Sequence, residues 1–138
     1  MTMTRPNALG APGYSERMPC EPESASRARR LVRAALNTWD LGHLIGDGTL
    51  IISELVGNAV RHSGSRRLHV SVRLSGPDRV RLAVTDKSPH PPIFQSPDGD
   101  DESGRGLMLV DAKADRWGTE HHTSGKIVWA ELHAKGSS

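Results

Sequence analysis

The sequence predicts an α+β protein built as a two-layer sandwich, with helices on one face of a mixed, mainly antiparallel sheet. Three observations lead to this prediction. Apolar residues recur at helical spacing in three segments, they alternate cleanly in residues 68–74 and 80–84, and four strand-like segments form two consecutive pairs joined by short turns. Strands joined by tight turns pair antiparallel, and helices grouped on one face of such a sheet bury its apolar side.

The first half of the chain contains two of the predicted helices. Residues 14–20 come first and form a short edge strand, since Pro19 cannot donate to a central ladder. A helix follows over residues 22–39, where Pro22 suits the first turn. Its core-facing positions repeat at helical spacing: Ala25, Ala28, Leu31, Val32, Ala35, Leu36 and Trp39. A second helix runs from about 46 to 62 and ends before Ser63-Gly64-Ser65.

The second half supplies most of the sheet. Residues 68–74 and 80–85 alternate and form a hairpin around Ser75-Gly76-Pro77-Asp78. A long loop follows at residues 87–103, and loops of this length are often lids or binding segments. A third helix opens at Gly104-Arg105-Gly106. Two last strands, 116–121 and 126–132, complete the sheet.

The 138 residues suit one domain, which we expect over residues 14–134, between a flexible N-terminal tail (1–13) and a polar C-terminal tail (135–138). Charged residues make up 25% and hydrophobic residues 36%, as in soluble globular proteins. No apolar run approaches the roughly 20 residues that span a bilayer, so no membrane association is expected. A single cysteine, Cys20, and the lack of a signal-peptide pattern indicate a cytoplasmic protein.

Charge patterning argues against a dedicated reader of nucleic acid. The one dense basic cluster is Arg27, Arg29, Arg30 and Arg33, and it is typical of a solvated helix face. Aromatic residues are few and no nucleic-acid-binding motif is present, so direct binding to DNA or RNA remains the weakest hypothesis. The seven histidines match no metal-ligand spacing.

Glu54 and Asn58 form the most informative pair in the chain. They lie four residues apart in the second helix, so their side chains stack on one face, beside an apolar stripe. A hard cation such as Mg²⁺ prefers oxygen ligands, and Asn supplies one without adding charge. The alternative is a solvated helix face, because polar pairs at this spacing are routine on helix surfaces.

Two further features follow in order along the chain. Asp86 has the same parity as the inward residues Val80, Leu82 and Val84, so it points to the core side of the sheet. There its carboxylate can accept a hydrogen bond from a ligand amine, which would compensate its burial. The alternative is that Asp86 only begins the turn after the strand. Gly104-Arg105-Gly106 at a helix start suits phosphate, through free N–H groups and the Arg105 cation, although glycine before a helix is also ordinary turn chemistry.

Together these motifs resemble the ATP-binding fold shared by gyrase B, Hsp90, histidine kinases and MutL, known as the GHKL or Bergerat fold. Within it, the chain is most similar to the actinobacterial anti-sigma-factor serine-protein kinases. Residues 53–62 resemble the N box of that family, residues 84–88 and the prolines after them its first glycine box, residues 102–107 with 114–118 its second, and residues 125–132 its terminal strand. The resemblance covers residues 14–134.

The resemblance implies ATP and Mg²⁺ as cofactors and assigns roles to these residues. Asn58 would bind the Mg²⁺ that bridges the ATP phosphates, and Glu54 would be the general base that takes the proton from an attacking serine hydroxyl. Asp86 would recognise the adenine amine. The phosphates would be cradled by the second glycine box: Gly104, Arg105, Gly106 and Leu107. Positioning and charge neutralisation of this kind are what phosphoryl transfer requires.

The resemblance also predicts function and partners. It implies an anti-sigma factor with serine/threonine-protein kinase activity toward an anti-sigma-factor antagonist, a sigma factor as binding partner, and a homodimer. The alternative is a non-catalytic partner-binding module that uses ATP as a structural or regulatory ligand. Three departures bear on the choice: Lys87, Pro89 and His90 follow Asp86 where relatives carry glycines, Ile127 replaces a threonine that assists adenine binding, and the 95–103 lid is short and acidic.

Overall fold

The computed structural model of the protein describes residues 2–3, 12–86, 101–123 and 125–134, and of these it describes residues 2–3 and 101–106 by their backbone alone. The elements in chain order are β1 (Thr2–Met3), β2 (Gly13–Pro19), α1 (Ser24–Thr38), the 3₁₀ turn η1 (Gly42–Leu44), α2 (Ile45–His62), β3 (Arg67–Gly76), β4 (Arg79–Asp86), α3 (Asp101–Lys113), β5 (Arg116–His122) and β6 (Gly125–His133). Within these ranges, no helix combines the length and apolarity needed to cross a membrane.

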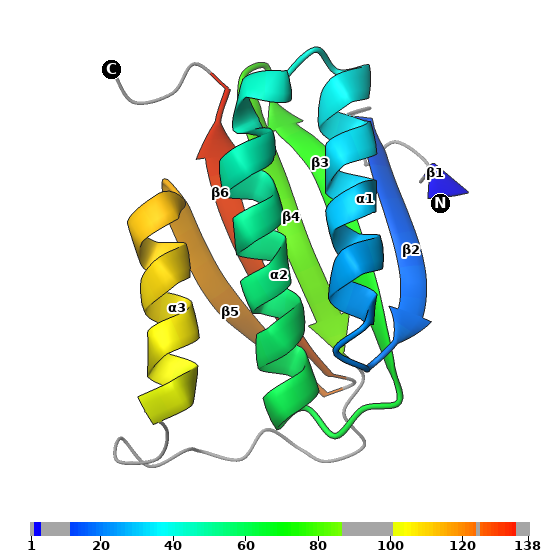
Figure 1. Ribbon diagram of the computed structural model, residues 1–138, viewed down its shortest axis with the longest axis vertical. Helices are drawn as coiled ribbons and strands as arrows, with labels where there is room; N and C mark the ends of the chain where they lie inside the picture. The colour runs from blue at the N-terminus through cyan, green and yellow to red at the C-terminus, as the bar shows by residue number, and fades with distance from the viewer. Residues whose placement is uncertain (1, 4–11, 87–100, 124, 135–138) are drawn as a thin grey trace.

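The strands form one sheet in the order β1-β2-β3-β4-β6-β5, and every neighbouring pair is antiparallel. All three helices lie on the same face of this sheet, with α2 between α1 and α3 (Figure 1). α2 packs against both of the other helices and against β4. The predicted two-layer α+β sandwich is confirmed.

The core lies between the helices and the even-numbered residues of the central strands. Val70, Val84 and Val128 are direct neighbours across β3, β4 and β6, and all three are buried. The helices contribute branched side chains such as Ile52, Leu55 and Leu31. Because strand residues alternate between faces, the odd-numbered residues of β3, β4 and β6 lie on the opposite face, which we call the open face.

Most element positions match the prediction within one or two residues, but the start of α3 does not. The helix begins at Asp101, three residues before the position expected from Gly104-Arg105-Gly106, so these three residues lie inside the helix. Acidic residues are favourable in a first turn because they complement the helix dipole, and the glycine pattern masked this signal. Residues 87–100 of the expected loop, with Lys87, Pro89 and His90, lie outside the described residues.

The N-terminal edge of the sheet also differs from the expectation. Thr2 and Met3, in the segment expected to be a flexible tail, pair with Ser15 and Tyr14 of β2. Over the rest of its length, β2 has no outer neighbour among the described strands, and Pro19 stands at its end, where a missing N–H costs least. Gly13, also in that expected tail, is the first residue of β2. Residues 1, 4–11 and 135–138 of the two expected tails lie outside the described residues.

Candidate functional site

Three elements that carry the predicted site residues meet at one end of the sandwich. The C-terminal end of α2, the last residue of β4 and the start of α3 all lie at the lower end of the molecule in Figure 1. Packing of α2 against both β4 and α3 holds them together. The fold therefore brings segments 54–62, 86 and 101–107 to one place, although they are up to about fifty residues apart in the sequence.

α2 holds Glu54 and Asn58 at different depths. Its buried stripe (Ile51, Ile52, Leu55, Val56 and Ala59) anchors the helix against the core. Asn58 joins this buried side and is only 5% exposed, whereas Glu54, one turn earlier, is half-buried. The carboxamide therefore lies in the interior at the edge of the core, and the carboxylate stays within reach of solvent.

Asp86 ends β4 on the helix-covered side of the sheet, as its parity predicts. It is 2% exposed, and it takes part in a polar interaction within the protein, so its burial is compensated. Leu68 of β3 and Lys126 of β6 are its direct cross-strand neighbours. Lys126 is a site neighbour that sequence reasoning missed. The register of β6 against β4 could not be read from the sequence, because each strand alternates without marking its partner residue.

The register also corrects the expectation about Ile127. Ile127 pairs with Thr85 and not with Asp86, so alternation places it on the open face, away from Asp86 and the helices. The residue on the same face as Asp86 is Lys126. Replacement of a threonine at position 127 therefore does not remove a group from the surroundings of Asp86.

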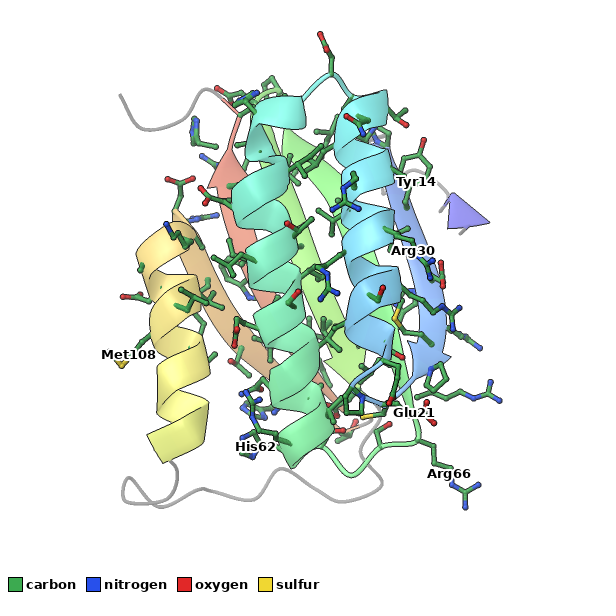
Figure 2. The ribbon with its side chains drawn as sticks, viewed as in Figure 1. Tyr14, Glu21, Arg30, His62, Arg66 and Met108 are labelled. Carbon is green, nitrogen blue, oxygen red and sulfur yellow. The ribbon has the colours of Figure 1, made fainter. Side chains whose placement is uncertain are left out.

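The second glycine box is described by its backbone and by Leu107. Gly104, Arg105 and Gly106 lie in the first two turns of α3, and their contact with phosphate stays a prediction. Leu107 is half-buried, and Val110, one turn further, is fully buried and fastens α3 to the core. Figure 2 shows His62, in the last turn of α2, on the side of that helix that faces α3.

The polar side chains of this site suit a nucleotide that is bound together with a metal ion held mainly by its phosphates. Among the described residues, no group of three or more His, Cys, Asp or Glu side chains could hold an ion by itself. Mg²⁺ is commonly held by one or two protein oxygens together with phosphate oxygens, and Asn58 can supply one such oxygen. Asp86 offers a buried carboxylate that can accept a hydrogen bond from an amine.

The family model of the histidine kinase-like ATPase domain matches residues 18–132 of the chain. The chain belongs to this family. The match includes every predicted site residue, from Glu54 on α2 to Leu107 on α3. Residues of a histidine kinase-like ATPase domain thus occupy nearly all of the predicted single domain, and ATP binding follows from membership of the family.

Individual relatives are consistent with this assignment. The chain is 39% identical over 85 residues to an uncharacterized protein of Streptomyces coelicolor, a match that covers 58% of this chain and 79% of that protein. Its fold is similar to the crystal structure of the RsbU and RsbW domains of Rv1364c from Mycobacterium tuberculosis, with a TM-score of 0.67, 23% identity and 88% of this chain covered. The chain spans only 32% of that structure.

A second solved structure supports the same fold. The histidine kinase domain of the blue-light-activated histidine kinase from Erythrobacter litoralis EL346 superposes with a TM-score of 0.54 at 18% identity, over 86% of this chain and 62% of that one. At these identities, both structures support the ATPase fold alone.

Proposed function

We propose that this ATP-binding protein is a serine/threonine-protein kinase that phosphorylates an anti-sigma-factor antagonist and also binds a sigma factor. The observation that carries the proposal is the placement of Glu54. Glu54 is half-buried one helical turn before the buried Asn58, on the helix whose C-terminal end lies at the same end of the sandwich as Asp86. A carboxylate accessible from outside, beside a nucleotide site, suits a base that meets a protein substrate.

Each side chain has one task in this proposal. Asp86 accepts a hydrogen bond from the adenine amine, and Asn58 contributes an oxygen to Mg²⁺ at the phosphates. Glu54 takes the proton of the substrate serine hydroxyl as its oxygen attacks the γ-phosphorus of ATP, which leaves ADP and a phosphoserine. Positioning and neutralisation of charge supply most of the acceleration in phosphoryl transfer, and a general base adds typically about 10²–10⁴-fold.

The motif resemblance to anti-sigma-factor serine kinases supports the choice of substrate and partner. The fold similarity to a protein of Mycobacterium tuberculosis that contains an RsbW domain is consistent with it. Membrane association and nucleic-acid binding play no part in the proposed role. We place the protein in the cytoplasm, where a sigma factor and its regulators act.

The proposal is tested by assaying phosphoserine formation on candidate antagonists with Mg-ATP, by mass spectrometry. We expect Glu54→Gln to reduce transfer by about 10²–10⁴-fold while thermal stabilisation by ATP remains. Asn58→Ala should lose both transfer and the ATP-dependent rise in melting temperature, which follows RT ln(1 + [L]/Kd). Glu120→Gln, an exposed carboxylate on β5, is the matched control and should leave both unchanged.

Two outcomes would contradict the proposed kinase function. One is equal transfer by wild type and Glu54→Gln. The other is ATP-dependent stabilisation of wild type without transfer to any candidate, which would favour the binding module that uses ATP as a regulatory ligand. If ATP stabilises neither wild type nor Asn58→Ala, the nucleotide site itself is wrong.

A further inference from the structure

A hollow of about 520 Å³ lies at the end of the sheet that also carries Asp86. Its strand residues belong to the open face, except for the buried Leu68. It is lined by Arg17 of β2, His69 of β3 and Thr85 of β4, together with the loop that follows α2. Thr85 and Asp86 are consecutive in β4 and point to opposite faces, so the hollow opens on the face of the sheet away from the Asp86 side chain. Leu68, the cross-strand neighbour of Asp86, is the lining residue that lies between the two.

The charge of the hollow is one-sided. Arg17, Arg66 and Arg67 all line it, together with His69, and no carboxylate from the described part of the chain does. Other arginines of the protein are neutralised locally; for example, Arg81 and Arg116 pair with Glu131. In contrast, no carboxylate of the described residues forms an ion pair with any of the three arginines of the hollow. Such a group of cations attracts an anion of more than one charge.

The loop that carries Arg66 and leads into Arg67, the first residue of β3, is held in place by its own hydrogen bonds. Gly64 adopts a left-handed conformation (φ 66°), which turns the chain after α2. The backbone N–H of Ser65 donates to Ser63 Oγ at 3.0 Å, and Ser65 Oγ donates to the carbonyl of Arg67 at 2.8 Å. The N–H of Cys20 donates to the carbonyl of Arg66 at 2.9 Å, which ties the loop to the end of β2.

The strands supply the remaining groups in a defined row. Arg17, His69 and Thr85 are direct neighbours across β2, β3 and β4, and Arg67 stands two residues before His69 on the same face. Neighbouring strands lie about 4.8 Å apart, so the row from Arg17 to Thr85 is about 10 Å long. Arg66 extends outward from the same end of the molecule (Figure 2).

We propose that this hollow is a second anion site that binds a phosphate-bearing small ligand. Guanidinium groups match phosphate oxygens with two hydrogen bonds each, the Thr85 hydroxyl adds a donor, and the volume lies within the range of small-molecule pockets. The site does not depend on the proposed kinase activity.

The experiment titrates ¹⁵N-labelled full-length protein with pyrophosphate and, in a second arm, with O-phosphoserine, against sodium chloride at matched ionic strength. We expect amide shifts at Gly64, Ser65, His69 and Thr85 that chloride does not produce. Arg17→Gln and Arg67→Gln should each raise Kd about tenfold or more, because each removes charge-assisted hydrogen bonds. The tighter probe of the two tells whether the phosphate comes from a free polyphosphate or from a phosphorylated amino acid.

Arg73→Gln is the matched control, since Arg73 is an exposed arginine on the same strand and face but outside the hollow. Its Kd should change less than about twofold, as expected for a screened surface charge. If Arg73→Gln weakened binding of the probe as much as Arg17→Gln and Arg67→Gln do, general surface charge would explain the binding, and the proposal would be overturned. The proposal would also be overturned if Arg17→Gln and Arg67→Gln both bound the probe as tightly as wild type, or if the amide shifts were confined to Asn58 and its neighbours.

Discussion

The two faces of the central sheet are built on the same strands but stabilised in different ways. On the helix-covered face, Val70, Val84 and Val128 stand in a row and are at most 5% exposed. On the open face, the row of Arg81, Glu131 and Arg116 replaces valines with charges. One face excludes water with helices, and the other relies on polar groups that pair within the sheet.

The open face is organised around one buried carboxylate. Glu131 is 2% exposed; it accepts hydrogen bonds from Arg81 Nε and Arg116 Nε, each at 3.0 Å, and from Arg116 Nη2 at 2.6 Å. The guanidinium carbon of Arg81 also lies 4.2 Å from the centre of the Trp129 ring, a cation–π distance. Polar groups can thus be as closely packed on an open sheet face as valines are under helices, but their contribution depends on charge and therefore on pH.

The largest expected effect lies on the helix-covered face. Leu82→Ala removes a fully buried side chain from the centre of the core, and we expect it to lower the free energy of unfolding by about 2–5 kcal/mol. Arg73→Ala, on the open face of the neighbouring strand, should change it by no more than about 0.5 kcal/mol. Urea unfolding followed by circular dichroism measures both. Comparable losses in the two variants would remove the distinction between the faces.

A smaller loss is expected where the open face is tightly packed. A Cβ at Gly118 would lie 2.9 Å from a ring carbon of Trp129, and Arg81 stacks on that ring. Gly118→Ala should therefore lower the free energy of unfolding by about 1–3 kcal/mol, the usual cost of overpacking.

Gly46→Ala is the control for that substitution. Position 46 lies in the first turn of α2, and a Cβ added there would meet no atom within 4 Å, so alanine should stabilise the protein by up to about 0.5–1 kcal/mol through its helix propensity. The two substitutions add the same methyl group and differ only in surroundings. If Gly118→Ala were as stabilising as Gly46→Ala in the same urea series, Trp129 would not be held as the structure shows.

The helix-covered face was predictable from the sequence because its signal is local and periodic. The spacing of Leu55, Asn58 and Ala59, and the parity of Asp86 with Val84, locate these residues without any knowledge of the partner strand. The family resemblance added the roles of the site residues, which periodicity alone does not give.

The open face and the strand register could not be predicted in the same way. Glu131, Arg81 and Arg116 come from three strands, and nothing in the sequence marks them as neighbours until β6 is paired with β4 and β5. The same register places Lys126, and not Ile127, directly beside Asp86. The start of α3 was misplaced because two glycines resembled a helix boundary, although Asp101 already lies in the helix.

The smallest effect depends on the charge of Glu131 and can be separated by pH. Burial raises the pKa of this carboxyl. The hydrogen bonds from Arg116 and Arg81 and the positive charges of these two residues lower it by more, so its pKa lies below the ordinary value of 4.5. A lowered folded-state pKa means that the ionised group stabilises the folded protein fully above about pH 4.5 and loses this contribution as the pH falls through the folded value.

Glu131→Gln keeps the size of the side chain and removes the charge, so we expect it to cost about 1 kcal/mol at pH 7. The difference from wild type should shrink as the pH falls below 4.5, since protonated Glu131 and glutamine are then alike. Urea unfolding at a series of pH values measures this. Glu16→Gln provides the comparison, because Glu16 pairs with Arg27 of α1 and its pKa is also lowered. A Glu131→Gln difference that stays constant from pH 7 to below the folded pKa would show that shape, and not charge, stabilises the open face.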